Sequence, residues 1–137
     1  MKQSVLDNIQ KNPSELKRAI ELTHKAALIG FDWPDINPVF DKITEETQEL
    51  KEAITTGKQD KILDELGDVL FVCANLARHL GIDPELALEH ANEKFELRFR
   101  QVETIAKQKH PKQSQYNLEI LDNIWNQVKI LEHSNIK

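Results

Sequence analysis

The sequence predicts an all-α protein, a bundle of four to five antiparallel helices. Apolar residues recur at helical spacing along most of the chain, and no stretch shows the alternation of a strand. Charged residues make up 30% of the 137 positions, with only four Gly and five Pro, which is typical of a helical domain with a charged surface. An Asn or Asp followed by Pro, the pattern with which helices often begin, occurs at 12–13, 37–38 and 83–84.

These signals place the helices in order. The expected ranges are 13–30, 38–56, 60–80, 84–107 and from about 118 onward. Gly57 and Gly81 end the second and third helices, and Glu15 is a capping-box partner for Asn12. A chain of this length predicts one domain, residues 1–137, with its core at about 13–131.

Each expected helix has an apolar stripe that we predict to be buried. The stripe residues are Leu16, Ala19, Ile20 and Ala27; Phe40, Ile43, Leu50 and Ile54; Leu88, Ala91, Phe95, Phe99 and Val102; and Leu121, Ile124, Trp125, Val128 and Leu131. The third helix is apolar over a broad arc, so we expect it to be central, with Cys73 as a small buried side chain. Close helix packing is the interpretation for Gly67 within it.

Composition also excludes several classes of partner. The formal net charge is -5 and the chain has no block of Lys or Arg, which argues against a nucleic-acid partner. No apolar run approaches the roughly 20 residues of a membrane span, and the first residues lack the apolar stretch of a signal peptide. We therefore expect a cytoplasmic protein without a membrane partner.

Two pairs of acidic residues flank the turn at Gly57. Glu46 and Glu49 are one helical turn apart, and Glu46 lies on the shoulder of the second helix's apolar stripe. Glu65 and Asp68 are likewise one turn apart along one edge of the third helix. Four converging carboxylates would repel one another unless a cation lies between them. Hard oxygen ligands suit Mg²⁺ or Mn²⁺, so the pattern predicts a metal site.

These acids have two other interpretations, a solvated helix face and a di-iron site. A single Glu-x-x-Glu is typical of a solvated helix face, where Glu45 and Glu52 would pair with nearby lysines. Two such pairs on matching edges of one helical hairpin favour the metal. A di-iron bundle would need Glu-x-x-His on two helices, and no His follows a Glu by three in this region.

The acids belong to a wider pattern. Glu-Glu-x-x-Glu at 45–49 followed by Glu-x-x-Asp at 65–68 resembles the motif of MazG-type nucleoside triphosphate pyrophosphohydrolases, an all-α superfamily that includes dimeric dUTPases and phosphoribosyl-ATP pyrophosphohydrolases. The resemblance covers about residues 5–131 and is to the C-terminal domain of two-domain bacterial MazG. Further matching segments are "GFDWPD" (30–35), "DELGDVLFVCANLARHLGIDPELAL" (64–88), "ANEKFELRFRQVE" (91–103) and "IWNQVK" (124–129).

The resemblance implies Mg²⁺-dependent hydrolysis of NTPs or dNTPs to a nucleoside monophosphate and pyrophosphate, a housecleaning of the nucleotide pool. By matching positions it implies Glu46, Glu49, Glu65 and Asp68 as metal ligands, and Lys61, Lys94, Arg98 and Trp125 in the nucleotide site. Asn92 is a candidate contact to sugar or phosphate, with core hydrogen bonding as the alternative. Trp33 is either a lid or a plug for the end of the bundle.

Several alternatives stay open at this stage. A metal-bound water is the natural nucleophile, and either Glu45 or Glu49 is the candidate general base. The rival functions are a non-catalytic, metal-stabilised helical interaction module and a narrower enzyme like the dUTPases or phosphoribosyl-ATP pyrophosphohydrolases. The broad apolar arc of the third helix predicts at least a homodimer, with the last helix or Phe71 across the two-fold axis, and the resemblance adds a dimer of dimers.

Overall fold

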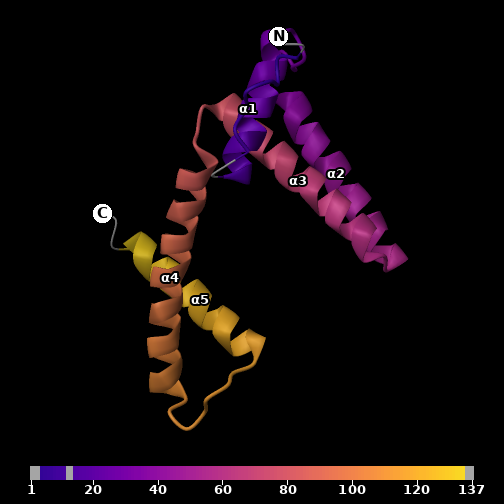
Figure 1. Ribbon diagram of the computed structural model, residues 1–137. Coiled ribbons are helices and arrows are strands. Elements are labelled where there is room, and N and C mark those ends of the chain that lie inside the picture. Colours follow the sequence, from indigo (N-terminus) through magenta and orange to yellow (C-terminus); the bar gives the residue numbers. More distant parts are fainter. Residues whose placement is uncertain (1–3, 12–13, 135–137) are drawn as a thin grey trace. The chain divides into compact units, whose positions relative to one another are not determined.

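The computed structural model describes residues 4–11 and 14–134, and this part of the chain contains α-helices and no strands. The helices are α1 (Glu15–Leu28), α2 (Asn37–Thr56), α3 (Gln59–Leu80), α4 (Pro84–Lys109) and α5 (Leu118–Ser134) (Figure 1). The predicted all-α class is therefore confirmed. The chain divides into two compact units, Met1–Ala87 and Leu88–Lys137, and the expectation of one domain stays a prediction. None of the described helices is both long and apolar enough to cross a bilayer.

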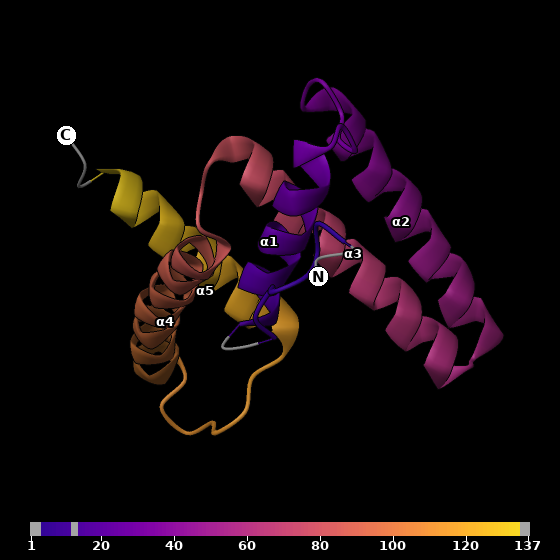
Figure 2. The same ribbon diagram turned by 45° about the horizontal axis from the view of Figure 1, so that its top comes forward.

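The first unit is built around α3, which contacts both α1 and α2. Two views show α2 and α3 side by side and antiparallel (Figures 1 and 2). Gly57 makes the tight connection with φ at 69°, in the left-handed region that favours glycine. The turn thus brings the two acid-bearing stretches onto facing helices, and the predicted central place of the third helix is confirmed within this unit.

The helix starts match the sequence signals only in part. Ser14 caps α1, its Oγ accepting the Lys17 N–H at 3.3 Å, while Asn12 and Pro13 lie outside the described residues. Asn37 was expected to cap the second helix, and this is wrong: it is already helical, and Asp35 Oδ1 accepts its N–H at 2.9 Å. The cap at Asp83 is confirmed by its bond from the Glu85 N–H at 2.9 Å.

The buried face of α2 differs from the predicted stripe. Val39, Glu46 and Ala53, spaced seven residues apart, are buried, whereas Phe40 is 50% exposed and Ile54 is 56% exposed. The predicted stripe followed the largest apolar side chains, but the helix is turned so that smaller ones face α3. As a result Glu46 lies at the middle of the buried face and not on its shoulder.

On α3 the buried residues are Val72, Ala74 and Asn75. Cys73 was expected to be buried, but it is exposed. The packing interpretation of Gly67 is also wrong within this chain, because a Cβ built there would meet no described atom within 4 Å. Several large apolar residues of the same helix are exposed: Leu63, Leu66, Leu70, Phe71 and Leu80.

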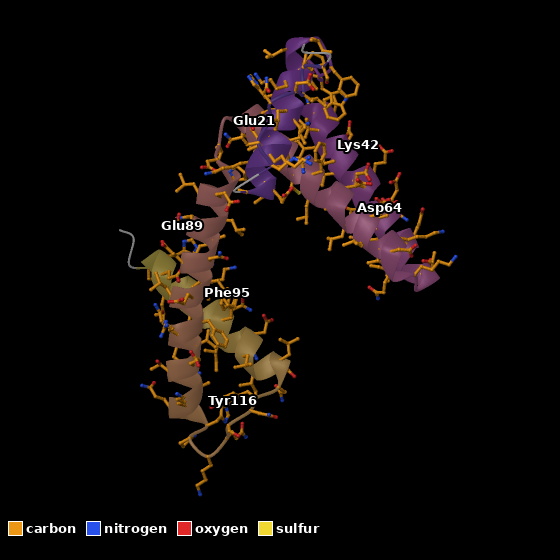
Figure 3. All side chains as sticks on the ribbon, in the orientation of Figure 1. Glu21, Lys42, Asp64, Glu89, Phe95 and Tyr116 are labelled. Atoms are coloured by element: carbon orange, nitrogen blue, oxygen red, sulfur yellow. The ribbon has the colours of Figure 1, made fainter. Side chains whose placement is uncertain are left out.

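The second unit consists of α5 packed on α4. Its core is Val102 and Ala106 from α4 with Ile124 and Val128 from α5, so the predicted burial of Val102, Ile124 and Val128 is confirmed. The predicted burial is wrong for Leu88, Ala91, Phe95, Phe99 and Leu131, which are exposed. Phe95 (labelled in Figure 3) stacks on Phe99 with ring centres 5.8 Å apart and meets Trp125 at 5.5 Å.

Candidate functional site

The four predicted acidic residues meet between α2 and α3. Glu46, Glu49 and Glu65 each place a carboxylate oxygen within 4.8 Å of the other two, and a second group joins Asp64, Glu65 and Asp68. We call these five residues the acid cluster. Figure 3 labels Lys42 and Asp64, which lie on the two facing helices. The sequence analysis missed Asp64, although it directly precedes Glu65 in "DELGD".

Two carboxylate oxygens of the acid cluster are buried without a hydrogen-bond partner. Glu46 is 6% exposed, and Lys42 Nζ lies 3.1 Å from its Oε1. Among the described residues, Glu46 Oε2 and Glu65 Oε2 have no hydrogen-bond partner. A buried charged oxygen left unpaired is costly, because it has lost water and gained nothing in exchange. The orphaned oxygens and the all-oxygen donor set therefore fit a hard divalent cation.

The electrostatics of the acid cluster agree with this. A proton shared with the Glu46 carboxylate and the negative charge of Glu46, followed by burial and the charge of Glu65, raise the pKa of Glu49 to about 7. Burial, followed by the charges of Asp64 and Glu46, raises the pKa of Asp68, although Lys42 opposes the change. Glu49 and Asp68 thus hold a proton more tightly than usual because the site has too little positive charge.

Of the two candidate bases, only Glu49 belongs to the acid cluster. Glu45 is exposed and lies outside both groups of converging acids, with its carboxylate 3.3 Å from Lys42 Nζ. Hydrogen bonds to Glu46 and then Glu45 raise the pKa of Lys42, so this lysine stays protonated beside the acids. Lys61, a predicted nucleotide contact, is exposed in the first turns of α3.

A cavity opens beside the acid cluster. A hollow of about 200 Å³ contains Glu46 and Asp68, together with Trp33, Lys42, Phe71, Val72 and Asn75. A larger cavity of about 580 Å³ shares Trp33, Lys42, Phe71 and Asn75 and extends to α1 and to the loop before α2. We call the two together the acid-side cavity. The sequence analysis missed Lys42 and Asn75; the signal for Asn75 was a polar residue within the apolar run "LFVCANLA".

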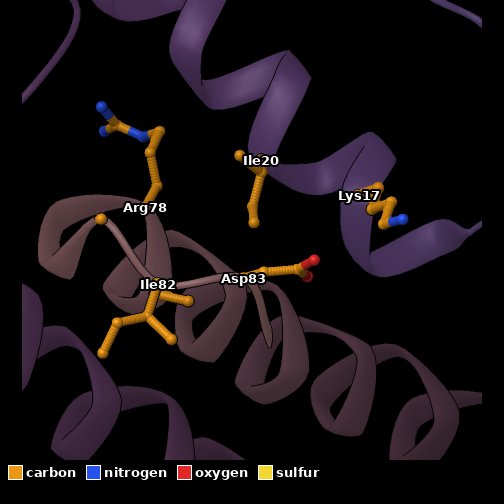
Figure 4. Close-up of a pocket in the computed structure, with 7 residues that line it drawn as sticks. Lys17, Ile20, Arg78, Ile82 and Asp83 are labelled. Carbon is orange, nitrogen blue, oxygen red and sulfur yellow. The ribbon is translucent and has the colours of Figure 1, made fainter. Parts of the chain in front are cut away.

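A separate hollow of about 340 Å³ lies where the end of α3 meets α1 (Figure 4). Lys17, Ile20, Ile82 and Asp83 line it, and it shares Arg78 with the acid-side cavity. It contains none of the predicted site residues.

The remaining predicted residues belong to the second unit. Arg98 Nε donates to both carboxylate oxygens of Glu132, at 3.0 and 2.9 Å, and its guanidinium carbon lies 5.9 Å from the centre of the Trp125 ring. The structure therefore brings Arg98 and Trp125 together and adds Glu132, which the sequence analysis missed. Asn92 and Lys94 are exposed, so core hydrogen bonding does not explain Asn92.

The part of the chain that contains the acid cluster matches a known protein family. Residues 37–103 match the MazG nucleotide pyrophosphohydrolase domain. The chain carries a MazG domain. The matched segment spans α2, α3 and most of α4, so it includes the acid cluster, Lys94 and Arg98, while Trp125 lies beyond it. The predicted resemblance to the MazG family is confirmed.

Individual relatives extend the MazG similarity beyond that segment. The chain is 42% identical over 130 residues to the nucleoside triphosphate pyrophosphohydrolase of Escherichia coli K12, covering 92% of this chain and 49% of that protein. It is 37% identical over 129 residues to the nucleoside triphosphate pyrophosphohydrolase/pyrophosphatase MazG of Thermotoga maritima, covering 93% and 49%. A shorter match, 41% over 68 residues, is to the uncharacterized protein YabN of Bacillus subtilis. The chain thus spans about half the length of the first two relatives.

Proposed function

We propose that this chain hydrolyses nucleoside triphosphates and deoxynucleoside triphosphates to a nucleoside monophosphate and pyrophosphate, and so removes unwanted nucleotides from the pool. The observation that carries the proposal is the pair of orphaned carboxylate oxygens on Glu46 and Glu65, buried in a cluster of acids. A phosphate chain is itself anionic, so a cation must lie between it and these acids. The names of the two bacterial relatives support the same reaction.

The proposed metal is Mg²⁺, with Mn²⁺ as a substitute, held by Glu46, Glu49, Glu65 and Asp68. When bound, such an ion lowers the pKa of a coordinated water and neutralises charge on phosphate oxygens. We assign the general base to Glu49 because it lies in the acid cluster, whereas the Glu45 carboxylate is turned to Lys42. In the metal-free chain the pKa of Glu49 is raised to about 7, and its role as base requires that one of its carboxylate oxygens stays free of the ion.

The acid-side cavity is the proposed place for the nucleoside. Its larger part, about 580 Å³, is within the range of small-molecule sites, and Trp33 and Phe71 give it aromatic walls. Lys61, Asn92, Lys94, Arg98 and Trp125 are the proposed further contacts to the nucleotide. Arg98 must exchange the carboxylate of Glu132 for a phosphate group to take this role.

Release of pyrophosphate from a panel of NTPs and dNTPs, with Mg²⁺ and with EDTA, tests the proposal. We expect turnover of several nucleotides with Mg²⁺ and none with EDTA. A rise in melting temperature on adding Mg²⁺ without any turnover would instead support the non-catalytic module. Turnover of dUTP or phosphoribosyl-ATP alone would support the narrower enzyme.

The cellular location, the oligomeric state and the partners of the protein are proposals as well. We propose that the protein acts in the cytoplasm as a homodimer, or a dimer of dimers, without a nucleic-acid or membrane partner. The formal net charge of -5 and the exposed apolar residues of α3 support this.

A further inference from the structure

A chain of hydrogen bonds connects the loop before α2 to the last turns of α3. Asp32 Oδ1 accepts the backbone N–H of Trp33 at 2.9 Å and a hydrogen bond from Arg78 Nη2 at 2.8 Å, and His79 Nε2 lies 3.0 Å from the same oxygen. Arg78 also donates from Nε to Asn75 Oδ1 at 2.9 Å. One guanidinium therefore joins a loop residue to a residue on the buried face of α3.

Both ends of this chain of bonds lie at the acid-side cavity. Trp33 and Asn75 line its smaller part together with Glu46 and Asp68, and they line its larger part as well. The link between them is partly sheltered, since the side chains of Arg78 and His79 are 15% and 11% exposed and that of Asp32 is 24% exposed. Charge-assisted hydrogen bonds sheltered in this way hold geometry better than ion pairs in full solvent.

The Asp32 carboxylate of the loop stays ionised at neutral pH. The hydrogen bond from Arg78 lowers the pKa of Asp32, and this outweighs the opposing effect of burial. Arginine keeps its proton under all ordinary conditions. Both partners of the link therefore stay charged across the neutral pH range.

We propose that Arg78 and Asp32 are positioning residues for the acid-side cavity: they hold Trp33 at its mouth and fix the orientation of the Asn75 amide. Asp32 does the first by accepting the backbone N–H of Trp33, which fixes the main chain that carries the ring. Arg78 does the second by occupying Asn75 Oδ1, so that Asn75 offers the cavity its N–H donors and binds an acceptor group on the ligand. That the ligand is a nucleoside rests on the proposed function; the positioning itself does not.

The experiment uses Trp33 as its own reporter. The chain has two tryptophans, so the full-length Trp125→Phe protein leaves Trp33 as the only tryptophan, and selective excitation of tryptophan avoids emission from Tyr116. In this background Asp32→Asn removes the negative charge from the hydrogen bond with Arg78. Arg78→Lys keeps the positive charge but lacks the planar guanidinium that bonds Asp32 and Asn75 at once. We expect both changes to shift Trp33 emission to longer wavelength and to increase its quenching by acrylamide, while helical circular dichroism persists.

Two matched controls belong to this test. Asp35→Asn makes the same change in the same loop, at a carboxylate whose Oδ1 accepts the Asn37 N–H at 2.9 Å. Arg18→Lys makes the same change at an exposed pair with Glu15 on α1. Neither is expected to alter Trp33 emission.

The kinetic arm uses the same substitutions in the otherwise unaltered chain. We expect the KM for a nucleoside triphosphate to rise about tenfold, with a smaller change in kcat, because the affected contacts are to the bound ligand. Unchanged Trp33 quenching in folded Asp32→Asn and Arg78→Lys would overturn the inference, as would an unchanged KM in both. If the parent chain shows no turnover, the proposed function falls, and Trp33 quenching alone decides the positioning role.

Discussion

Lys42 and Glu46 form an ion pair across one turn of α2, with Nζ 3.1 Å from Oε1, yet the other oxygen of Glu46 has no partner. A single ammonium group thus faces a buried carboxylate that also borders Glu49 and Glu65. The lysine cannot balance three or more acids, as the raised pKa values of Glu49 and Asp68 indicate. The first two predictions follow from this shortage of positive charge.

Glu46→Gln should reduce Mg²⁺-dependent pyrophosphate release by about 100-fold or more, because a divalent ion supplies several kcal/mol of charge stabilisation that one lost ligand compromises. Helical circular dichroism should be retained, since the amide has the same shape and removes a buried charge. The measurement is the rate at saturating Mg²⁺ and substrate. Glu52→Gln, at an exposed position on the same helix, is the control and should keep normal activity. Normal turnover in Glu46→Gln would remove this residue from the metal site.

The metal-free protein should lose stability as the pH rises from about 5 to 8. Glu49 has a pKa of about 7 in the folded chain against an ordinary value of 4.5, so between these values the folded state binds a proton that the unfolded state has released. Stability present below pH 4.5 is therefore lost as the pH rises through 7. Thermal melts in EDTA should show a falling Tm, and Mg²⁺ should reduce the fall because the ion replaces the proton. Glu49→Gln should flatten the profile; a Tm that climbs through this window would contradict the assignment.

Four of the five residues of the acid cluster, all but Asp64, were predicted from the sequence because helical periodicity and one tight turn determine where they lie. Glu46, Glu49, Glu65 and Asp68 lie on two helices whose ends Gly57 and Gly81 mark, so their convergence follows from local rules. The rotation of α2 was not predictable in the same way. Phe40 and Ile54 are larger than Val39 and Ala53, and only the fit against α3 decides which set faces inward.

Arg98→Ala and Lys94→Ala should each weaken binding of a nucleoside triphosphate by roughly 10- to 100-fold, the usual cost of a lost hydrogen bond to a charged group. Binding of the monophosphate should change much less, since both residues are assigned to the phosphate tail. Titration calorimetry with both nucleotides and Ca²⁺ in place of Mg²⁺ measures this. Arg100→Ala is the control, because Arg100 forms an exposed pair with Glu96 at 3.2 Å on the same helix. Equal losses for the two ligands would move these cations away from the phosphates.

The cavity wall and the Arg98 contact depended on residues far apart in sequence. Arg78 reaches Asp32 across 46 positions and Arg98 reaches Glu132 across 34, and no helical period connects such pairs. The sequence left Trp33 as either a lid or a plug, because the residues around it in the fold lie far from it in sequence. In the structure Trp33 lines the cavity, and its backbone N–H bonds Asp32, which Arg78 holds in turn.

The last prediction concerns the exposed apolar face of α3. Leu63 is 73% exposed and Leu70 is 53% exposed, and they lie on one face with Gly67 between them. Exposed apolar patches of this kind usually mark an interface, and a glycine among them lets a second helix approach closely. A symmetric pair of chains is the simplest closed arrangement that would cover the face. Sedimentation at micromolar concentration should therefore give about twice the chain mass of 15.8 kDa or more.

Substitutions on this face distinguish a dimer interface from a solvated surface. Leu63→Asp should shift the sedimenting species to the monomer, whereas Leu28→Asp, at an exposed leucine that ends α1, should not. Gly67→Ala is a second test, in which a solvated surface and a dimer interface predict opposite effects. On a solvated helix it should raise stability by about 1 kcal/mol, because alanine is the better helix former and its Cβ meets no atom of the described residues within 4 Å outside the adjacent helix backbone. If a partner helix packs there, the added methyl group should instead weaken association. If the unaltered protein is a monomer and Gly67→Ala raises its stability, this face of α3 is exposed to water.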